Sequence, residues 1–359
     1  MKVKFLYRGR SANGDALWLR QFPEGKPKWG DVEFIFDKDY TEYDWLVVYD
    51  DLPPENTERF SRRKELLKCP RNNTLLITSE PSTIKVYGKR YTDQFGIVLT
   101  TQEPWAIKHQ NAIHSQCGYR WFYGIGSRSI KSFDQIKNNP PTDKTRVIST
   151  VCSQKKQKNT VHAARYAFTQ KLKAHLPELD VFGRGVREIE DKAEALDSYK
   201  YHVVIENFSG LHHWSEKLAD SFLGHTLPLY YGCSNVDEYF PSDSIIKIDP
   251  YKVDESIEII KSALSGDEYE KRFSAICEAR KLVIEKYNFF AVVADIIQSQ
   301  PRVDAGISNG TKFVLKSRRS ARDSNVLSSL GYYIERYGIK SRHAIMRNLN
   351  FTPSEGKRS

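Results

Sequence analysis

Two carboxylates, an amide and a lysine lie close together within residues 199–232 of this 359-residue chain. A predicted strand ends at Glu206 and Asn207, and the predicted helix that follows carries Glu216 and Lys217 in its first turn. A helix N-terminus offers free N–H groups and a positive dipole end, and a lysine adds a cation, so this pattern suits a diphosphate. Carboxylates beside it can accept hydrogen bonds from sugar hydroxyls. Many strand–loop–helix turns in α/β proteins nevertheless bind no ligand.

The elements that would position these residues are short apolar strands alternating with helices. In the first part, strands are predicted at 2–7, 32–36, 45–50, 74–78 and 96–100, and helices at 56–67 and 82–91. After Pro140 and Pro141, strands are predicted at 146–150, 179–183, 201–207, 226–232 and 245–249, and helices at 161–175, 193–199, 215–223, 254–265 and 269–300. This alternation predicts an α/β fold with two doubly wound domains that face a cleft.

The stretch from 199 to 232 also resembles the donor-binding motif of glycosyltransferase family 10, the α1,3/1,4-fucosyltransferases. The matching segments are Tyr199-Lys200-Tyr201, Glu206-Asn207, Trp214-Ser215-Glu216-Lys217-Leu218 and Pro228-Leu229-Tyr230-Tyr231-Gly232. His213 stands where the family usually has tyrosine, within the same donor pocket. The order and spacing of these segments are those of the family.

Three further segments are similar to family motifs. Residues 162–172 resemble the helix whose arginine reaches the donor phosphates, which gives that role to Arg165. Residues 181–185 resemble a strand end that places Gly183 against the donor, and residues 75–81 resemble the segment of the catalytic base, which becomes Glu80. The residues alone leave an alternative for each: Arg165 could be a surface arginine, residues 181–185 an ordinary turn, and Glu80 the cap of the next helix.

The resemblance implies a GT-B fold with an acceptor-binding domain at 1–142 and a GDP-sugar domain with a return helix at 143–304. The charge pattern adds a basic helical tail at 305–359. It implies inverting transfer of L-fucose from GDP-β-L-fucose to a hydroxyl of a GlcNAc-containing glycan, with α1,3 linkage, on a bacterial surface glycan such as lipopolysaccharide. Glu80 would be the base, since the attacking hydroxyl must lose a proton. The alternatives to this function are the same fold with another GDP-sugar donor, and a non-catalytic module that binds membrane or nucleic acid.

In the implied mechanism, Arg165 and Lys217 neutralise the departing diphosphate, and Asn207 and Glu216 hold ribose or fucose hydroxyls. Glu206 holds hydroxyls or orients the loop. No metal is expected, because these cations can replace one. The Asp-Lys-Asp run at 37–39 is interpreted as a solvated turn, and the single cysteines and paired histidines lack the spacing of a metal site.

The formal charge of +10 is concentrated at the end of the chain. Eleven basic and three acidic residues lie between Lys312 and Arg358, which is +8, so a nucleic-acid-binding body is not expected. An apolar stripe there predicts a helix that lies on an anionic membrane or packs on the body; its members are Val326, Leu327, Leu330, Tyr333, Ile334 and Tyr337. With neither a signal peptide nor a spanning segment expected, the predicted location is cytoplasmic, peripheral on the inner face of the membrane.

Overall fold

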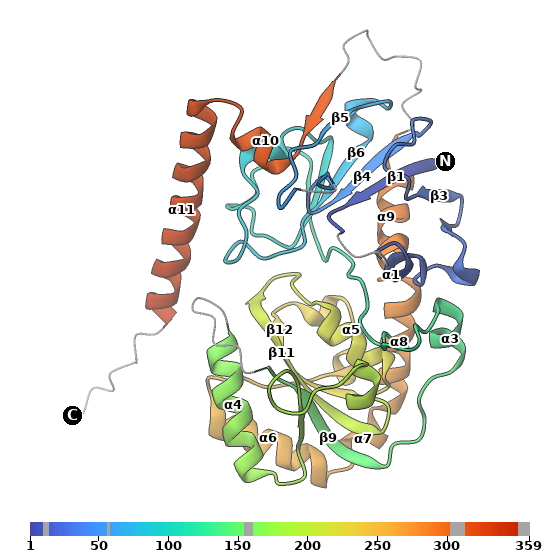
Figure 1. Cartoon of the computed structure of the whole chain (residues 1–359). Helices are drawn as coiled ribbons and strands as arrows, with labels where there is room; N and C mark the ends of the chain where they lie inside the picture. The colour runs from blue at the N-terminus through green and yellow to red at the C-terminus, as the bar shows by residue number, and fades with distance from the viewer. Residues whose placement is uncertain (10–13, 56–57, 154–160, 302–312, 351–359) are drawn as a thin grey trace, which may run out of the picture. The chain divides into compact units, whose positions relative to one another are not determined.

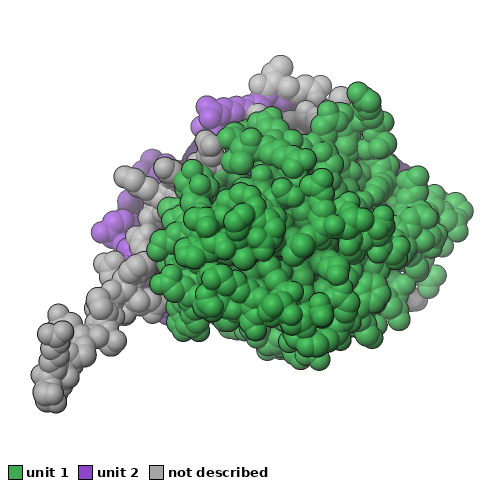
Figure 2. Space-filling view, turned by 90° about the horizontal axis from the view of Figure 1, so that it is seen from below, with its two compact units in different colours: residues 1–2, 9–35, 115–302 green, residues 3–8, 36–114, 303–359 purple. Residues whose placement is uncertain are grey.

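A computed structural model gives the fold and describes residues 1–9, 14–55, 58–153, 161–301 and 313–350 (Figure 1). Its contacts divide the chain into two units, coloured separately in Figure 2. Unit 1 comprises residues 1–2, 9–35 and 115–302, and unit 2 comprises residues 3–8, 36–114 and 303–359. This division differs from the predicted boundaries, because residues 9–35 group with the second half of the chain and the C-terminal segment groups with the first.

Unit 1 contains a five-stranded parallel sheet in the order β10-β9-β11-β12-β13. Its strands are β9 (Arg146–Val151), β10 (Asp180–Phe182), β11 (Tyr199–Gly210), β12 (Leu227–Cys233) and β13 (Ile246–Lys247). Alternate residues of β11 enter different cores: Tyr201, Val203 and Ile205 belong to one, and Val204 to the other. Helices therefore cover both faces of this sheet, as in a doubly wound domain.

The helices of unit 1 follow the predicted alternation. They are α4 (His162–His175), α5 (Glu216–Leu223), α6 (Val253–Ser265), α7 (Glu268–Lys271), α8 (Phe273–Glu285) and α9 (Phe289–Gln298). The core of α4 and α6 lies on one face, and that of α5 and α8 on the other. The predicted single helix at 269–300 was wrong, because Asn288 separates α8 from α9. Its Oδ1 accepts from Phe290 N at 2.9 Å as the N-cap of α9, and its Nδ2 donates to Gln21 O at 2.8 Å.

Shorter elements complete unit 1. They are α1 (Ala16–Leu19), η1 (Pro23–Gly25), β2 (Lys28–Trp29), β3 (Val32–Ile35), α3 (Phe133–Asn138), η3 (Lys192–Ala195), η4 (Val236–Glu238) and η5 (Ser242–Ser244). The N-terminal segment packs by aromatic contact, with the Phe22 ring stacked on Phe290 at 3.8 Å. The predicted helix at 193–199 is only the short η3 turn, after which β11 begins at Tyr199.

Unit 2 is built on five parallel strands in the order β1-β4-β6-β7-β8. These are β1 (Lys2–Tyr7), β4 (Trp45–Tyr49), β6 (Thr74–Ile77), β7 (Ile97–Thr100) and β8 (Ala112–His114). Leu46, Leu76 and Val98 share one core on this sheet with Leu315 from the C-terminal segment. The predicted fold class is thus confirmed: each unit is an α/β domain with a parallel sheet.

Two predicted helices of unit 2 were wrong. In place of the helix at 56–67, the structure has β5 (Lys64–Leu66), which pairs antiparallel with β14 (Val314–Lys316). Local sequence does not reveal this partner, because it lies some 250 residues away. Residues 56–57 lie outside the described residues, and η2 (Arg71–Asn73) follows β5. Instead of a helix at 82–91, only α2 (Lys89–Thr92) forms, because Gly88 precedes it with φ +87°.

The C-terminal segment ends in α10 (Arg318–Arg322) and α11 (Val326–Asn350). One face of α11 packs on unit 2: Glu335 Oε2 accepts from Lys89 N at 3.0 Å, His343 Nε2 lies 2.6 Å from Ser82 Oγ, and Lys340 donates to the Thr83 carbonyl. The predicted helix is confirmed and is longer than expected. Residues 305–312 and 351–359 of the predicted tail lie outside the described residues.

Candidate active site

Glu206 occupies the centre of the polar cluster in unit 1. It lies in β11, its side chain is fully buried, and both of its oxygens bind the start of α5. Oε1 accepts from Ser215 N at 2.8 Å, and Oε2 accepts from Ser215 Oγ at 2.6 Å. A buried carboxylate needs such donors to offset the loss of water. Glu206 therefore fixes the N-terminus of α5 against the end of the strand.

Lys217 lies between the two carboxylates of this cluster. Its Nζ is 3.3 Å from Glu206 Oε2 and 3.1 Å from Glu216 Oε1. Although burial opposes the charged form, these carboxylates raise the pKa of Lys217 above its ordinary value. Although burial also favours the neutral acid at Glu216, the Lys217 ammonium lowers the pKa of Glu216 to about 2. Glu216 and Lys217 are therefore both charged at neutral pH.

Arg165 comes to the same cluster from α4. It is buried, and its Nη1 donates to Asn207 Oδ1 at 3.2 Å, so the helix and the end of β11 are joined at this point. Within the described residues, its buried Nε has no hydrogen-bond partner. A buried guanidinium with an open donor is suited to an anionic ligand oxygen.

Two glycines permit close packing around these residues. A Cβ at Gly232 would lie 2.4 Å from Glu206 Cγ, so only glycine at this point of β12 leaves room for the buried carboxylate. Gly183 follows β10 with φ +131°, and a Cβ there would lie 2.7 Å from the carbonyl oxygen of Cys152. The structure thus explains Gly183 by backbone packing between neighbouring strand ends.

His213 is buried in the loop between β11 and α5. Its ring packs edge-on against Phe208, with 5.4 Å between centroids. The preceding residue, His212, has φ +62°, and its Nδ1 lies 2.6 Å from the Tyr239 hydroxyl. The loop that the motif predicted to shape the donor pocket is held by these contacts.

Glu80 belongs to unit 2, where it follows the end of β6. Its carbonyl accepts from Gln102 Nε2 at 2.7 Å, and the same amide donates to Lys85 O at 2.9 Å, which fixes the 80–85 loop. The neighbouring Ser79 hydroxyl donates to Asp50 Oδ1 at 2.9 Å. The main chain at Glu80 is therefore held on both sides.

Asp50 is the centre of that second network. Its Oδ1 also accepts from Tyr87 OH at 2.7 Å and from the Lys85 ammonium, and its backbone has φ +73°. Although burial opposes ionisation, the Lys85 ammonium and the hydroxyl donors lower the pKa of Asp50. Sequence reasoning missed Asp50, and it named Ser215 and Gly232 only as members of the family motif. Ser215 carried a signal, because serine before an acidic first turn is a typical N-cap.

The predicted site residues therefore fall in two places. The structure brings Arg165, Asn207, Glu206, Glu216 and Lys217 together in unit 1, whereas Glu80 lies in unit 2. In the part of the chain that the structure describes, no three His, Cys, Asp or Glu side chains are grouped to hold a metal ion. At 37–39, Asp39 N donates to Asp37 Oδ1 at 2.9 Å in a tight turn.

A parallel α/β unit with charged side chains at its strand ends is the class of fold that binds nucleotides at this edge. Residues 141–274 match the sequence model of the C-terminal part of glycosyltransferase family 10 (fucosyltransferase), so the resemblance seen in the motifs is confirmed. The α-(1,3)-fucosyltransferase FucT of Helicobacter pylori is 34% identical over 74 residues, which are 20% of this chain. The chain matches only 16% of the length of that relative.

Two solved structures of α1,3-fucosyltransferase are also similar. The first is 14% identical and covers 84% of this chain, with 90% of its own length covered and a TM-score of 0.49. The second, a complex with GDP-fucose, is 14% identical and covers 79% of this chain, with 90% of its own length covered and a TM-score of 0.44.

Proposed function

We propose that this protein is an inverting α1,3-fucosyltransferase that moves L-fucose from GDP-β-L-fucose to a hydroxyl of a GlcNAc-containing glycan. The observation that carries the proposal is the cluster of Arg165, Asn207, Glu206, Glu216 and Lys217, which lies inside the segment that matches the family. A bacterial surface glycan such as lipopolysaccharide is the proposed acceptor. The proposed location is the cytoplasm, peripheral on the inner face of the membrane.

On the donor side, the proposed work is charge neutralisation. The bond from the anomeric carbon to the diphosphate breaks, and GDP leaves with an added negative charge. Arg165 has an open buried donor, and Lys217 remains protonated because two carboxylates hold its charge. Fixed cations at the point where charge develops lower the barrier without reorganisation. Asn207 and Glu216 supply polar groups for ribose or fucose hydroxyls, and no metal takes part in the proposed reaction.

On the acceptor side, we assign Glu80 as the general base. It would take the proton of the attacking hydroxyl as the new glycosidic bond forms at the anomeric carbon. Its main chain is held by Gln102 and, through Ser79, by Asp50. A base with a fixed backbone needs less reordering before reaction.

Nucleotide-induced stabilisation tests the donor half of this proposal. GDP and GDP-fucose should raise the melting temperature and UDP should not, since a ligand stabilises the state that binds it. Arg165→Ala should remove most of the shift, whereas Arg146→Ala, an exposed arginine of the same unit, should retain it. No shift with any guanine nucleotide would exclude the transferase. A shift with GDP and transfer only from another GDP-sugar would favour the alternative donor.

Glu80→Gln tests the base. It should reduce transfer by about 1000-fold, within the range of general-base catalysis, and leave GDP affinity within twofold. Glu58→Gln, at a carboxylate elsewhere in unit 2, is the control. If Glu80→Gln instead weakened GDP binding and left the transfer rate at saturating donor unchanged, the role of Glu80 as the base would be wrong.

We also propose that α11 rests on an anionic membrane. Its six stripe residues are between 51% and 84% exposed while the opposite face packs on unit 2, so the helix presents apolar side chains to solvent. Such a face, flanked by basic residues, suits the interface of a bilayer. No helix in the described part of the chain is long and apolar enough to cross a membrane.

The membrane proposal is tested with three substitutions on that free face. Leu330→Ser, Tyr333→Ser and Tyr337→Ser together should weaken binding to phosphatidylglycerol vesicles about tenfold or more, because each removes apolar area from the bilayer. Activity on a soluble acceptor should be unchanged, since each of these side chains is more than half exposed and none belongs to the predicted site. Unchanged vesicle binding would contradict the proposal.

A further inference from the structure

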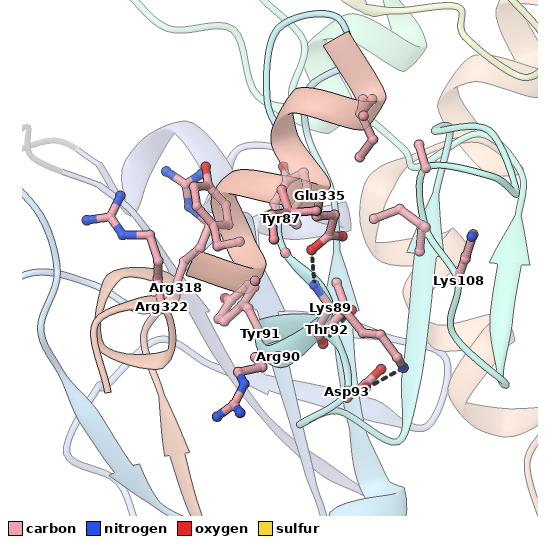
Figure 3. Close-up of a pocket in the computed structure, with 18 of the residues that line it drawn as sticks. Tyr87, Lys89, Arg90, Tyr91, Thr92, Asp93, Lys108, Arg318, Arg322 and Glu335 are labelled. Carbon is pink, nitrogen blue, oxygen red and sulfur yellow. Dashed lines mark hydrogen bonds and ion pairs between the residues drawn. The ribbon is translucent and has the colours of Figure 1, made fainter. Parts of the chain in front are cut away.

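Unit 2 contains a cavity of about 730 Å³ between α11 and the segment from Tyr87 to Lys108. All of its lining residues belong to unit 2, and none of the site residues predicted from the sequence is among them. Figure 3 shows its wall, with Glu335 of α11 above the backbone of Lys89, Arg318 and Arg322 to one side, and Lys108 to the other. A cavity of this size can hold a sugar or nucleotide-sized ligand.

The lining carries a large excess of positive charge. Its cations are Lys89, Arg90, Lys108, Arg318, Arg322 and Arg342, and its carboxylates are Asp93 and Glu335. Lys89 pairs with Asp93 at 2.6 Å, and Arg322 pairs with Asp323 at 2.6 Å. Within the described residues, Arg90, Lys108 and Arg342 form no salt bridge. A concave surface with six cations and two carboxylates attracts a multiply charged anion.

Aromatic side chains share this wall with the cations. Trp105 and Tyr332 line it, and the Arg342 guanidinium lies over the Trp105 ring at 4.5 Å. Flat rings beside guanidinium groups suit a ligand that joins an anionic group to an organic body.

Two glycines of α11 are among the lining residues of the cavity. Gly331 and Gly338 are seven residues apart on α11, both line the cavity, and a Cβ at either position would meet no atom within 4 Å. Glycine inside a helix lowers its stability relative to alanine. No close packing explains their presence at these two lining positions.

We propose that this cavity binds a phosphate monoester, a dianion attached to an organic group, with its phosphate held by Lys108 and Arg342. A phosphate monoester matches the charge excess better than a carboxylate, because it carries two charges where a carboxylate carries one. The same phosphate chemistry can come from a soluble sugar phosphate or from a lipid headgroup. The inference does not depend on the proposed transferase activity, since it concerns binding in unit 2.

Calorimetry on the full chain with glucose 1-phosphate tests the soluble source. We expect binding that glucose does not reproduce, and Lys108→Ala with Arg342→Ala should weaken it about 10- to 100-fold, as expected for two charge-assisted contacts. Arg336→Ala is the matched control, because this exposed arginine of α11 does not line the cavity. Lys217→Ala, which removes a cation from the proposed donor site of unit 1, should also leave the affinity for glucose 1-phosphate within twofold.

Gly338→Leu separates binding from folding. A leucine at this position should fill the cavity and remove binding while leaving the melting temperature unchanged or higher, because the helix gains a better helix former. The lipid source is tested with vesicles that contain phosphatidic acid, using the Leu330/Tyr333/Tyr337 variant so that stripe contacts do not contribute. Binding to either probe that the cavity variants weaken supports the proposal. No binding to either, or binding that only Lys217→Ala weakens, overturns it.

Discussion

Each unit holds a carboxylate with little exposure at the end of a parallel strand, and the partners of the two carboxylates lie at different distances along the chain. Glu206 in unit 1 binds Ser215 and Lys217, which lie within eleven residues of it. Asp50 in unit 2 binds Ser79, Lys85 and Tyr87, which lie 29 to 37 residues further along the chain. The first network is thus local in sequence, and the second depends on tertiary structure.

The two networks also differ in the polar groups that they can offer to a ligand. The network of unit 1 contains a second carboxylate, a lysine and a buried arginine with an open donor. In the network of unit 2, one carboxylate oxygen is shared by two hydroxyls and an ammonium, and it fixes the segment before Glu80. We therefore interpret the first as a binding cluster and the second as a support.

The largest effect is expected from Glu206→Ala. It leaves Ser215 and Lys217 without their buried acceptor, so the free energy of unfolding should fall by about 3–5 kcal/mol. Urea unfolding measures this. Glu216→Ala is the control: its side chain is partly exposed, and it should cost only about 1 kcal/mol. Equal losses for the two variants would show that Glu206 does not hold the cluster together.

A smaller loss of about 2–3 kcal/mol is expected from Asp50→Asn, because the amide keeps one acceptor oxygen but leaves the Lys85 charge uncompensated. Since the network supports the segment before Glu80, transfer should slow while GDP affinity stays within twofold. Unfolding and initial-rate measurements test both. Asp39→Asn, whose side chain is largely exposed, is the control. If GDP affinity fell while the transfer rate held, the support role would be wrong.

The smallest expected effect is a pH dependence of unit 1. His202 is buried with Nδ1 2.7 Å from Ser149 Oγ, and burial lowers its pKa to about 3. Between about pH 6.5 and 3 the unfolded chain binds a proton that the folded chain does not, so stability falls as the pH falls. We expect a loss of about 1–2 kcal/mol from pH 6.5 to 5.

Urea unfolding across that pH range tests this prediction. His202→Gln should flatten the dependence, and His175→Gln, at an exposed histidine of α4, should leave it intact. A profile that His202→Gln does not change would assign the acid sensitivity to other groups.

The sequence predicted the strands and the unit 1 cluster because both depend on local signals. Runs such as 45–50 and 201–207 are apolar over the length of a buried strand, and the family motif spans one strand, loop and helix. The β5–β14 pair and the Asp50 network join residues far apart, which no local pattern reveals. The stripe of α11 was expected either to lie on a membrane or to pack on the body, and in the structure all six of its residues are more than half exposed.

The pairing of β14 with β5 also affects the order in which the units can fold as the chain is synthesised. All residues of unit 1 have been made once residue 302 is added, whereas unit 2 waits for its last strand and for α11. Domains made first usually fold first, and contacts across long separations form slowly. The unit whose sheet begins the chain is therefore the one completed last.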